Sequence, residues 1–178
     1  MRIIGGIYRS RKIVFPLSAE IRPTKDRIRE SIFSALSDEI INRRVLDLFA
    51  GSGAYGLETL SRGAASITFV DNNPLAIKAI NENIKNLGVS TQCQVFNEGY
   101  QSYLAKTKNE YSLIFLDPPY VLNIYLEVIK EILEKKIASS NAIIICETNH
   151  ALDFSSLGQE FKIREYHYGD TIVYILRR

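Results

Sequence analysis

The chain has 178 residues, 46% hydrophobic and 24% charged, a composition typical of a soluble globular protein with one full domain. No apolar run approaches the roughly 20 residues that a membrane span needs, and the N-terminus lacks the apolar core of a secretory signal. Cys93 and Cys146 are too few for a disulfide framework and do not have the spacing of metal ligands. We therefore expect a cytoplasmic protein without a metal site or membrane contact.

The net charge of +2 is distributed unevenly along the chain. Residues 1–44 carry ten Lys or Arg against five acids, whereas the rest of the chain carries 12 basic and 15 acidic side chains. A basic arm on a mildly acidic body predicts a polyanionic partner that one end of the molecule contacts. A solvated basic surface without a partner fits this composition equally well.

The first residues have the pattern of a short β-hairpin. Residues 3–8 and 12–15 read as two strands around Arg9-Ser10-Arg11, which places basic side chains at the tip of the hairpin. Pro16 ends the second strand.

A helix should begin near residue 24. Thr24 is suited to its N-cap, and Asp26 lies in the first turn, where negative charge is favourable. One face of this helix is apolar and consists of Ile28, Ile32, Phe33, Leu36 and Ile40. The helix should therefore pack on the body of the protein and present Arg27 and Arg29 to the outside.

From residue 45 onward, strand and helix patterns alternate, which is typical of a parallel sheet with helices on both faces. Buried strands are predicted at 45–50, 66–71, 92–96, 113–117 and 142–146. Asn73 and Pro74 are expected to begin a helix that Gly88 ends. Further helices should follow the first strand, the third strand and the fourth strand.

The C-terminal residues differ from this pattern. Residues 161–168 and 171–176 are predicted as strands joined only by Gly169-Asp170, a connection that permits only an antiparallel pair. The predicted fold is an α/β protein with a mostly parallel, doubly wound sheet that ends in an antiparallel hairpin.

The run Asp117-Pro118-Pro119-Tyr120 should lie at the carboxyl end of the fourth strand, where ligands bind in open α/β sheets. An exocyclic amine is a poor nucleophile because its lone pair is delocalised into the base. Asp117 and the Pro118 carbonyl can accept both amine hydrogens, and Tyr120 can stack on an extruded base. The run therefore predicts methyl transfer to an amino group, although two prolines and a tyrosine could also simply end a strand.

The turn after the first strand leaves two nucleotide cofactors open. Gly51-Ser-Gly-Ala-Tyr-Gly56 satisfies the G-x-G-x-x-G pattern and Asp71 follows 20 residues after Gly51, as in nicotinamide-dependent oxidoreductases. S-adenosylmethionine is favoured because a carboxylate at Asp47 suits its cationic end and would repel a pyrophosphate. A chain of 178 residues is also not expected to hold a second domain that could carry a hydride acceptor. Asp47 and Asp71 could each instead only bond a turn or cap a helix.

Asp47-Leu-Phe-Ala-Gly-Ser-Gly53 together with Asp117-Pro-Pro-Tyr120 resembles the class I amino-methyltransferases. Arg2-Ile-Ile-Gly-Gly6, Arg9-x-Arg11-Lys12 and Arg22-Pro-Thr-Lys-Asp-Arg-Ile-Arg-Glu30 narrow the resemblance to the bacterial 16S ribosomal RNA guanine-N(2)-methyltransferase family, the RsmD type. The similarity spans essentially the whole chain. It implies a Rossmann-like class I methyltransferase fold, S-adenosyl-L-methionine as cofactor, and methylation of one guanine in the small-subunit RNA of an assembled or assembling particle.

The resemblance also implies the site residues. Catalysis is expected from Asp117, Pro118, Pro119 and Tyr120. In proteins of this family, the positions after the third strand, near the cofactor adenine, commonly hold Asp or Asn followed by a small residue. In this chain the corresponding residues are Gly99-Tyr100, preceded by Asn97-Glu98. The expected cofactor-binding residues are Asp47, Phe49, Ala50, Gly51, Ser52, Gly53, Asp71, Asn72, Glu98, Gly99 and Tyr100.

The basic arm is expected to bring structured RNA to this site. The expected RNA-binding residues are Arg9, Arg11, Lys12, Arg22, Thr24, Arg27 and Arg29. Residues 1–43 would then be an RNA-contacting hairpin and helix, and residues 44–178 the cofactor-binding domain of a monomer. The alternatives are an adenine or cytosine amino-methyltransferase acting on DNA or another RNA, a nicotinamide-dependent oxidoreductase, and a non-catalytic RNA-binding module.

Overall fold

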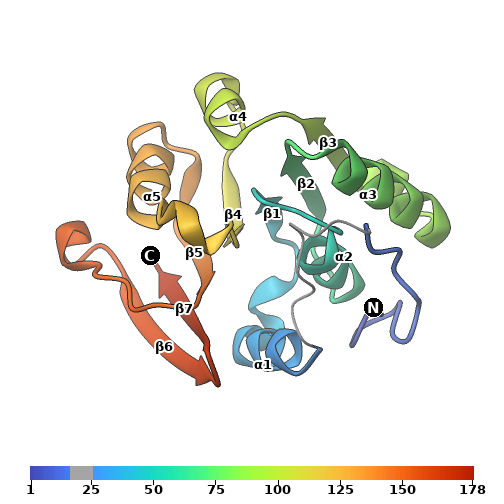
Figure 1. Ribbon diagram of the computed structural model, residues 1–178, viewed down its shortest axis with the longest axis horizontal. Helices are drawn as coiled ribbons and strands as arrows, with labels where there is room; N and C mark the ends of the chain where they lie inside the picture. The colour runs from blue at the N-terminus through green and yellow to red at the C-terminus, as the bar shows by residue number, and fades with distance from the viewer. Residues whose placement is uncertain (17–25) are drawn as a thin grey trace.

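The structure is a computed structural model that describes residues 1–16 and 26–178 (Figure 1). Its centre is a seven-stranded sheet in the order β3-β2-β1-β4-β5-β7-β6. The strands are β1 (Arg44–Asp47), β2 (Ser66–Asp71), β3 (Cys93–Asn97), β4 (Tyr111–Leu116), β5 (Ala138–Thr148), β6 (Lys162–Tyr168) and β7 (Thr171–Arg177). β1 to β5 are parallel, and β7 runs antiparallel to both of its neighbours. The predicted parallel sheet with a terminal antiparallel hairpin is confirmed.

Helices cover both faces of the sheet, so the molecule has three layers (Figure 1). The helices are α1 (Asp26–Leu36), α2 (Ala54–Ser61), α3 (Pro74–Leu87), α4 (Tyr100–Lys106) and α5 (Tyr125–Glu134). Single 3₁₀ turns are η1 (Ser37–Ile40), η2 (Ser90–Gln92), η3 (Tyr120–Leu122) and η4 (Ser155–Leu157). In the described part of the chain, no helix is long and apolar enough to cross a membrane.

Two hydrophobic cores lie on opposite faces of the sheet because alternate strand residues point to opposite sides. Val45 in β1 and Phe115 in β4 belong to the core under α1, α2 and α3. Leu46 and Leu116, one residue further along each strand, belong to the core under α4 and α5. Both faces of the central strands are buried, which explains their continuous apolar runs.

The predicted signals at the ends of α3 are present in the structure. Asn73 is the N-cap, and its side chain accepts a hydrogen bond from the Leu75 amide at 2.9 Å. Pro74 occupies the first helical position, and Gly88 ends the helix with a φ of 73°.

The N-terminal segment forms a looser structure than the predicted hairpin. The two sides of this segment, residues 1–16, are connected by an antiparallel bridge between Arg2 and Lys12. The connecting residues turn tightly against α2, where a Cβ on Gly6, whose φ is 75°, would lie 1.8 Å from the Ser61 carbonyl oxygen. Ile3 and Ile13 are buried in the same core as α1 and the sheet. The arm is therefore packed on the body, with no break in the core at the predicted boundary near residue 43.

Candidate active site

Three of the predicted acids lie at one edge of the sheet because the carboxyl ends of parallel strands meet there. Asp47 ends β1, Asp71 ends β2, and Asp117 follows the last residue of β4. β1 lies between β2 and β4, and Asp47 is in register with Phe69 and Phe115. Residues that are up to 70 positions apart in the sequence thus form one site, as the strand ends predicted.

The turn after β1 requires glycine at two positions. Gly51 and Gly53 have φ angles of 53° and 76°, in the left-handed region that glycine favours. A Cβ on Gly53 would lie 3.2 Å from both Phe69 and Ile80, so the turn is pressed against β2 and α3. Glycine at these two positions therefore lets the turn adopt this conformation and pack closely on β2 and α3.

Asp71 both ties this turn to β2 and offers a ligand-binding carboxylate. Its Oδ2 accepts a hydrogen bond from the Gly51 amide at 2.8 Å, and its Oδ1 accepts one from the Asn73 amide at 2.8 Å. The capping role considered as an alternative is therefore present. Burial raises the pKa of Asp71 above its ordinary value. Each carboxylate oxygen can accept a further hydrogen bond, so a ribose hydroxyl remains a compatible partner.

Asp47 is a buried acid whose described neighbours include no cation. Asp47 is 3% exposed. Its Oδ2 accepts a hydrogen bond at 3.1 Å from the amide of Gly56, which lies in the first turn of α2. Burial, with a smaller contribution from the charge of Asp71, raises the pKa of Asp47 from 3.8 to about 7. A cationic ligand group beside Asp47 would restore its ionised form. This environment fits the amino-acid end of S-adenosylmethionine.

Two aromatic rings lie at the same edge, Phe49 after β1 and Tyr100 after β3. The rings of Phe49 and Tyr100 lie 5.4 Å apart at a tilt of 50°. Glu98, in contrast, directs its carboxylate to α4, where it pairs with Lys106 at 2.7 Å and accepts from Ser102 at 2.7 Å. The aromatic pair is therefore the better candidate for contact with a flat purine, and Glu98 contributes to the structure of this corner.

Asp117 stands at the centre of an acidic cluster. Burial is the main reason why the pKa of Asp117 lies well above its ordinary value, and the charges of Glu147 and Asp47 raise it further. Pro118 is buried, Pro119 is exposed, and half-buried Tyr120 begins η3. The Tyr120 hydroxyl donates to Glu147 Oε1 at 3.4 Å. The tetrad thus forms a short rigid segment with an acid at its base and a phenol at its rim.

Sequence reasoning missed Glu147, which is 4% exposed near the carboxyl end of β5. Tyr55 from α2 donates a hydrogen bond to its Oε2. The Tyr125 hydroxyl donates to its backbone carbonyl at 2.6 Å. The only signal in the sequence is an acid that follows the apolar run 142–146, a pattern shared by many strand ends.

The predicted RNA-binding residues divide into three groups. Arg9, Arg11, Lys12 and Arg27 are exposed, and one Arg11 guanidinium nitrogen donates to the Asn86 carbonyl at 2.7 Å. Arg22 and Thr24 lie outside the described residues. Arg29 was expected on the outside, and this prediction is wrong.

Arg29 is fully buried between α1 and the N-terminal arm. Its Nη2 donates to the Arg2 carbonyl at 2.8 Å and pairs with Asp26 at 2.8 Å, and its Nη1 lies 4.0 Å from Glu58 Oε2. A guanidinium enclosed in this way cannot reach a phosphate. The helical pattern predicted that α1 packs on the body, but the position of the arm determined which side of α1 is covered.

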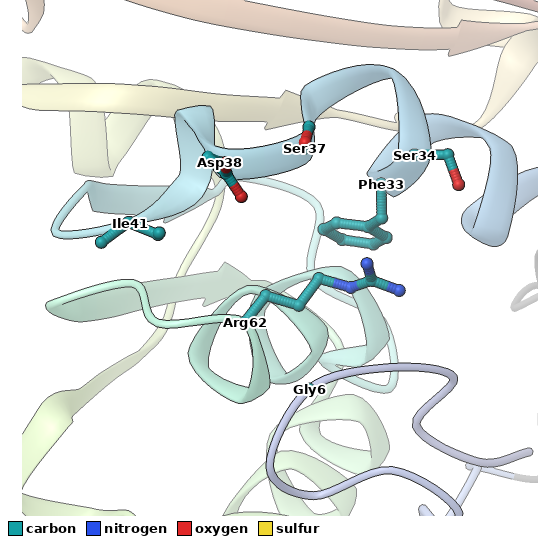
Figure 2. Close-up of a pocket in the computed structure, with 7 residues that line it drawn as sticks. All are labelled: Gly6, Phe33, Ser34, Ser37, Asp38, Ile41 and Arg62. Atoms are coloured by element: carbon teal, nitrogen blue, oxygen red, sulfur yellow. The ribbon is translucent and has the colours of Figure 1, made fainter.

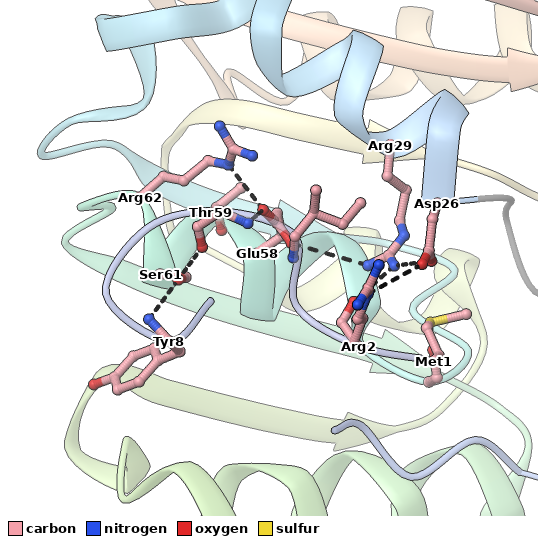
Figure 3. A network of polar contacts seen from close by, with 12 residues as sticks. Met1, Arg2, Tyr8, Asp26, Arg29, Glu58, Thr59, Ser61 and Arg62 are labelled. Atoms are coloured by element: carbon pink, nitrogen blue, oxygen red, sulfur yellow. Dashed lines mark hydrogen bonds and ion pairs between the residues drawn. The ribbon is translucent and has the colours of Figure 1, made fainter. Parts of the chain in front are cut away.

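The arm is fastened to α2 by Glu58, whose side chain is fully buried (Figure 3). The Ile4 and Gly5 amides donate to its two carboxylate oxygens at 2.7 and 2.8 Å, and Arg62 pairs with it at 2.8 Å. Buried Asn83 makes a second connection. Its amide nitrogen donates to the Ser52 carbonyl at 3.1 Å, and its oxygen accepts from the Val14 amide at 2.7 Å. The arm is thereby linked to the glycine turn.

A cavity of about 470 Å³ lies at the other end of α2 from the glycine turn (Figure 2). On the wall of this cavity, the Arg62 guanidinium lies 5.0 Å from the centre of the Phe33 ring. Its lining residues are Gly6, Phe33, Ser34, Ser37, Asp38, Ile41 and Arg62. None of these was predicted as a site residue, and the cavity is separate from the acidic cluster.

Comparison with known proteins agrees with this geometry. A family model described as "Conserved hypothetical protein 95" matches residues 1–177. The chain is 36% identical over 148 residues to "Ribosomal RNA small subunit methyltransferase D" of Escherichia coli, an alignment that covers 83% of this chain and 74% of that protein. "Putative rRNA methyltransferase YlbH" of Bacillus subtilis is 32% identical over 182 residues, which cover 100% of this chain and 99% of that protein.

A solved structure, "Putative methyltransferase yhhF from Escherichia coli", superposes with a TM-score of 0.90 at 31% identity and covers 100% of this chain and 97% of that one. The strand order and the glycine turn after β1 define the class I methyltransferase fold. Within that class, the chain belongs to the conserved hypothetical protein 95 family. This membership confirms the resemblance to the RsmD type.

Proposed function

We propose that this protein is an S-adenosylmethionine-dependent methyltransferase that modifies the exocyclic amine of a guanine in small-subunit ribosomal RNA. The observation that carries the proposal is the position of Asp117-Pro118-Pro119-Tyr120 beside the buried Asp47 and the glycine turn. The names of the relatives support the ribosomal RNA substrate. Guanine as the target base follows from the resemblance to the RsmD type.

Residues on three adjacent strand ends would hold the cofactor. Asp47 would face its cationic amino-acid end, Asp71 its ribose hydroxyls, and the rings of Phe49 and Tyr100 its adenine. The backbone of residues 51–53 would approach it closely. When bound, S-adenosylmethionine supplies a methyl group on a positively charged sulfur.

The tetrad would position the base for nucleophilic attack. Asp117 and the Pro118 carbonyl can accept both amine hydrogens, which directs the nitrogen lone pair toward the methyl group. Holding two reactants in the correct geometry can lower a barrier by roughly 7–11 kcal/mol. Asp117 can then take up the proton that the amine loses, because burial and its acidic neighbours raise its pKa. Tyr120 would stack on the base, a contact worth about 1–3 kcal/mol.

The exposed arginines and lysine of the arm would contact phosphates. Arg9, Arg11 and Lys12 extend from a segment that is fixed to α2, so their charges have a defined position relative to the site. Residues 1–43 would therefore act as the RNA-contacting extension of the cofactor-binding domain. We also propose that the protein acts as a monomer on an assembled or assembling particle.

The test uses labelled cofactor and small-subunit particles from cells that lack the enzyme. The wild type should label one guanine, which mass mapping of RNA fragments identifies as N2-methylated. Asp117→Ala should lower the rate at least about 100-fold, while calorimetry should show a cofactor affinity within about threefold of the wild type. The matched control is Asp170→Ala, at the exposed turn between β6 and β7.

Label on an adenine or cytosine would refute guanine as the target. Full activity of Asp117→Ala would refute the catalytic assignment. Thermal stabilisation by a nicotinamide cofactor instead of S-adenosylmethionine would favour the oxidoreductase.

A further inference from the structure

Glu147 is a buried acid at the edge of the active site that has no role in the proposed reaction as described above. It lies near the end of β5, whose Cys146 is in register with Leu116 of β4, so Glu147 is level with Asp117. Side chains alternate along a strand, and Phe115 and Ile145 both belong to the core under α1, α2 and α3. Asp117 and Glu147 therefore point to the same face of the sheet. Asp47 shares that face, because Val45 belongs to the same core.

The two carboxylate oxygens of Glu147 have different partners. Oε2 accepts from the Tyr55 hydroxyl, and the Tyr55 ring is stacked on Phe115 with ring centres 4.8 Å apart. Oε1 accepts from the Tyr120 hydroxyl at 3.4 Å. Glu147 thus bridges a ring fixed in the core to the ring at the rim of the tetrad. The Tyr125 hydroxyl, which donates to the Glu147 carbonyl at 2.6 Å, holds the backbone in place.

We propose that Glu147 is a positioning residue of this active site, which anchors the Tyr120 hydroxyl and places a second carboxylate beside Asp117. The inference rests on the proposed methyl transfer. A hydrogen bond at its hydroxyl end restricts where the phenol ring can lie, so a base that stacks on the ring is presented to Asp117 in a narrower range of positions. Burial and the neighbouring carboxylates raise the pKa of Tyr120, which keeps its hydroxyl protonated and able to donate.

The position of Glu147 beside Asp117 should also affect how the rate of methyl transfer depends on pH. The charge of Glu147 raises the pKa of Asp117 and so shifts its ionisation to higher pH. Removal of that charge should let Asp117 ionise at lower pH. The groups that face this pair are Asp47 from β1, Tyr55 from α2, Tyr120 from η3 and Tyr125 from α5.

The test compares Glu147→Gln and Tyr120→Phe with the wild type in the particle methylation assay. Glu147→Gln keeps the shape and removes the charge. Its kcat should fall about tenfold with an unchanged KM for the cofactor, and the acid limb of its kcat profile should move to lower pH. Tyr120→Phe should lower kcat by a similar factor without the shift, and the double variant should lose no more than either alone. Glu165→Gln, on the exposed face of β6, should match the wild type.

Coincident pH profiles for Glu147→Gln and the wild type, or additive losses in the double variant, would overturn the inference. If the wild type transfers no methyl group, the proposed function fails. The anchor is then measured by urea unfolding of the same four proteins. A bond between Glu147 and Tyr120 predicts a coupling of about fivefold in the unfolding equilibrium constant, and complete additivity would refute it.

Discussion

Replacement of Asp47 by Asn should stabilise the protein while it weakens cofactor binding. Burial raises the pKa of Asp47 from 3.8 to about 7, so the folded protein disfavours the ionised carboxylate. Each pKa unit corresponds to about 1.36 kcal/mol, so the cost of the charge is about 4 kcal/mol above the folded-state pKa. Asn is neutral and its oxygen can still accept the Gly56 amide. Its buried NH₂ group costs about 1 kcal/mol, which leaves an expected gain of about 3 kcal/mol.

The sign of the effect depends on pH in a defined way. Below the unfolded-state pKa of Asp47, the residue is neutral in both states. Only the cost of the buried NH₂ group then remains, so the variant should be about 1 kcal/mol less stable than the wild type. As the pH rises from about 4 to about 7, the unfolded chain ionises at Asp47 and the folded protein does not, so the wild type loses stability relative to the variant. Above about pH 7 the difference should be constant.

Urea unfolding at about pH 5, 6, 7 and 8, followed by circular dichroism, measures this difference. Asp170→Asn is the matched control and should give no pH-dependent gain, because Asp170 is exposed. A difference between Asp47→Asn and the wild type that is the same at every pH would refute the reasoning. Calorimetry should show weaker S-adenosylmethionine binding to Asp47→Asn, because the variant lacks the carboxylate for the cationic end of the cofactor.

Two further predictions concern the structural acids. Glu58→Gln should lower the free energy of unfolding by about 3 kcal/mol, because one oxygen that accepts an arm amide becomes an NH₂ group and Arg62 loses its ion pair. Trypsin should also cut the arm faster in this variant. The control variant Glu82→Gln, on the exposed side of α3, should behave as the wild type. If Glu58→Gln were as stable as the wild type, Glu58 would not hold the arm on α2. Asp71→Asn should weaken cofactor binding by about 1.5–3 kcal/mol, the value of a hydrogen bond to a charged group. Unchanged affinity in a calorimetric titration would exclude Asp71 as the ribose ligand.

The interactions of the N-terminal arm show where sequence reasoning was limited. Its basic composition predicted an external contact surface, and Arg9, Arg11 and Lys12 are indeed exposed. The same composition included Arg29, which lies in the interior next to Asp26 and Glu58. Charge counts give no information about which cations pair internally. Asp26 lies three residues from Arg29 in the same helix, but the second acid, Glu58, is 29 residues away in another helix.

The acidic cluster shows the same limit at the candidate active site. Asp47, Asp71 and Asp117 could be predicted because each ends a recognisable buried strand, and parallel strands bring such ends together. Glu147 also lies near a strand end, but nothing in its neighbourhood distinguishes it from an ordinary terminal acid. Its importance comes from Tyr55 and Tyr120, which are 92 and 27 residues away.

The sequence by itself determined the order of strands and helices, the glycine turn and the antiparallel end of the sheet. These features follow from local patterns, namely the spacing of apolar residues, capping residues and turn lengths, which a short window of sequence contains. The tertiary structure alone decided that Arg29 is enclosed and that Glu58 holds the arm on α2. It also decided that Glu147 lies close to Asp117 and accepts hydrogen bonds from two tyrosines. Each of these is a contact between distant segments. The identity of such a partner depends on how the helices and the arm pack on the sheet.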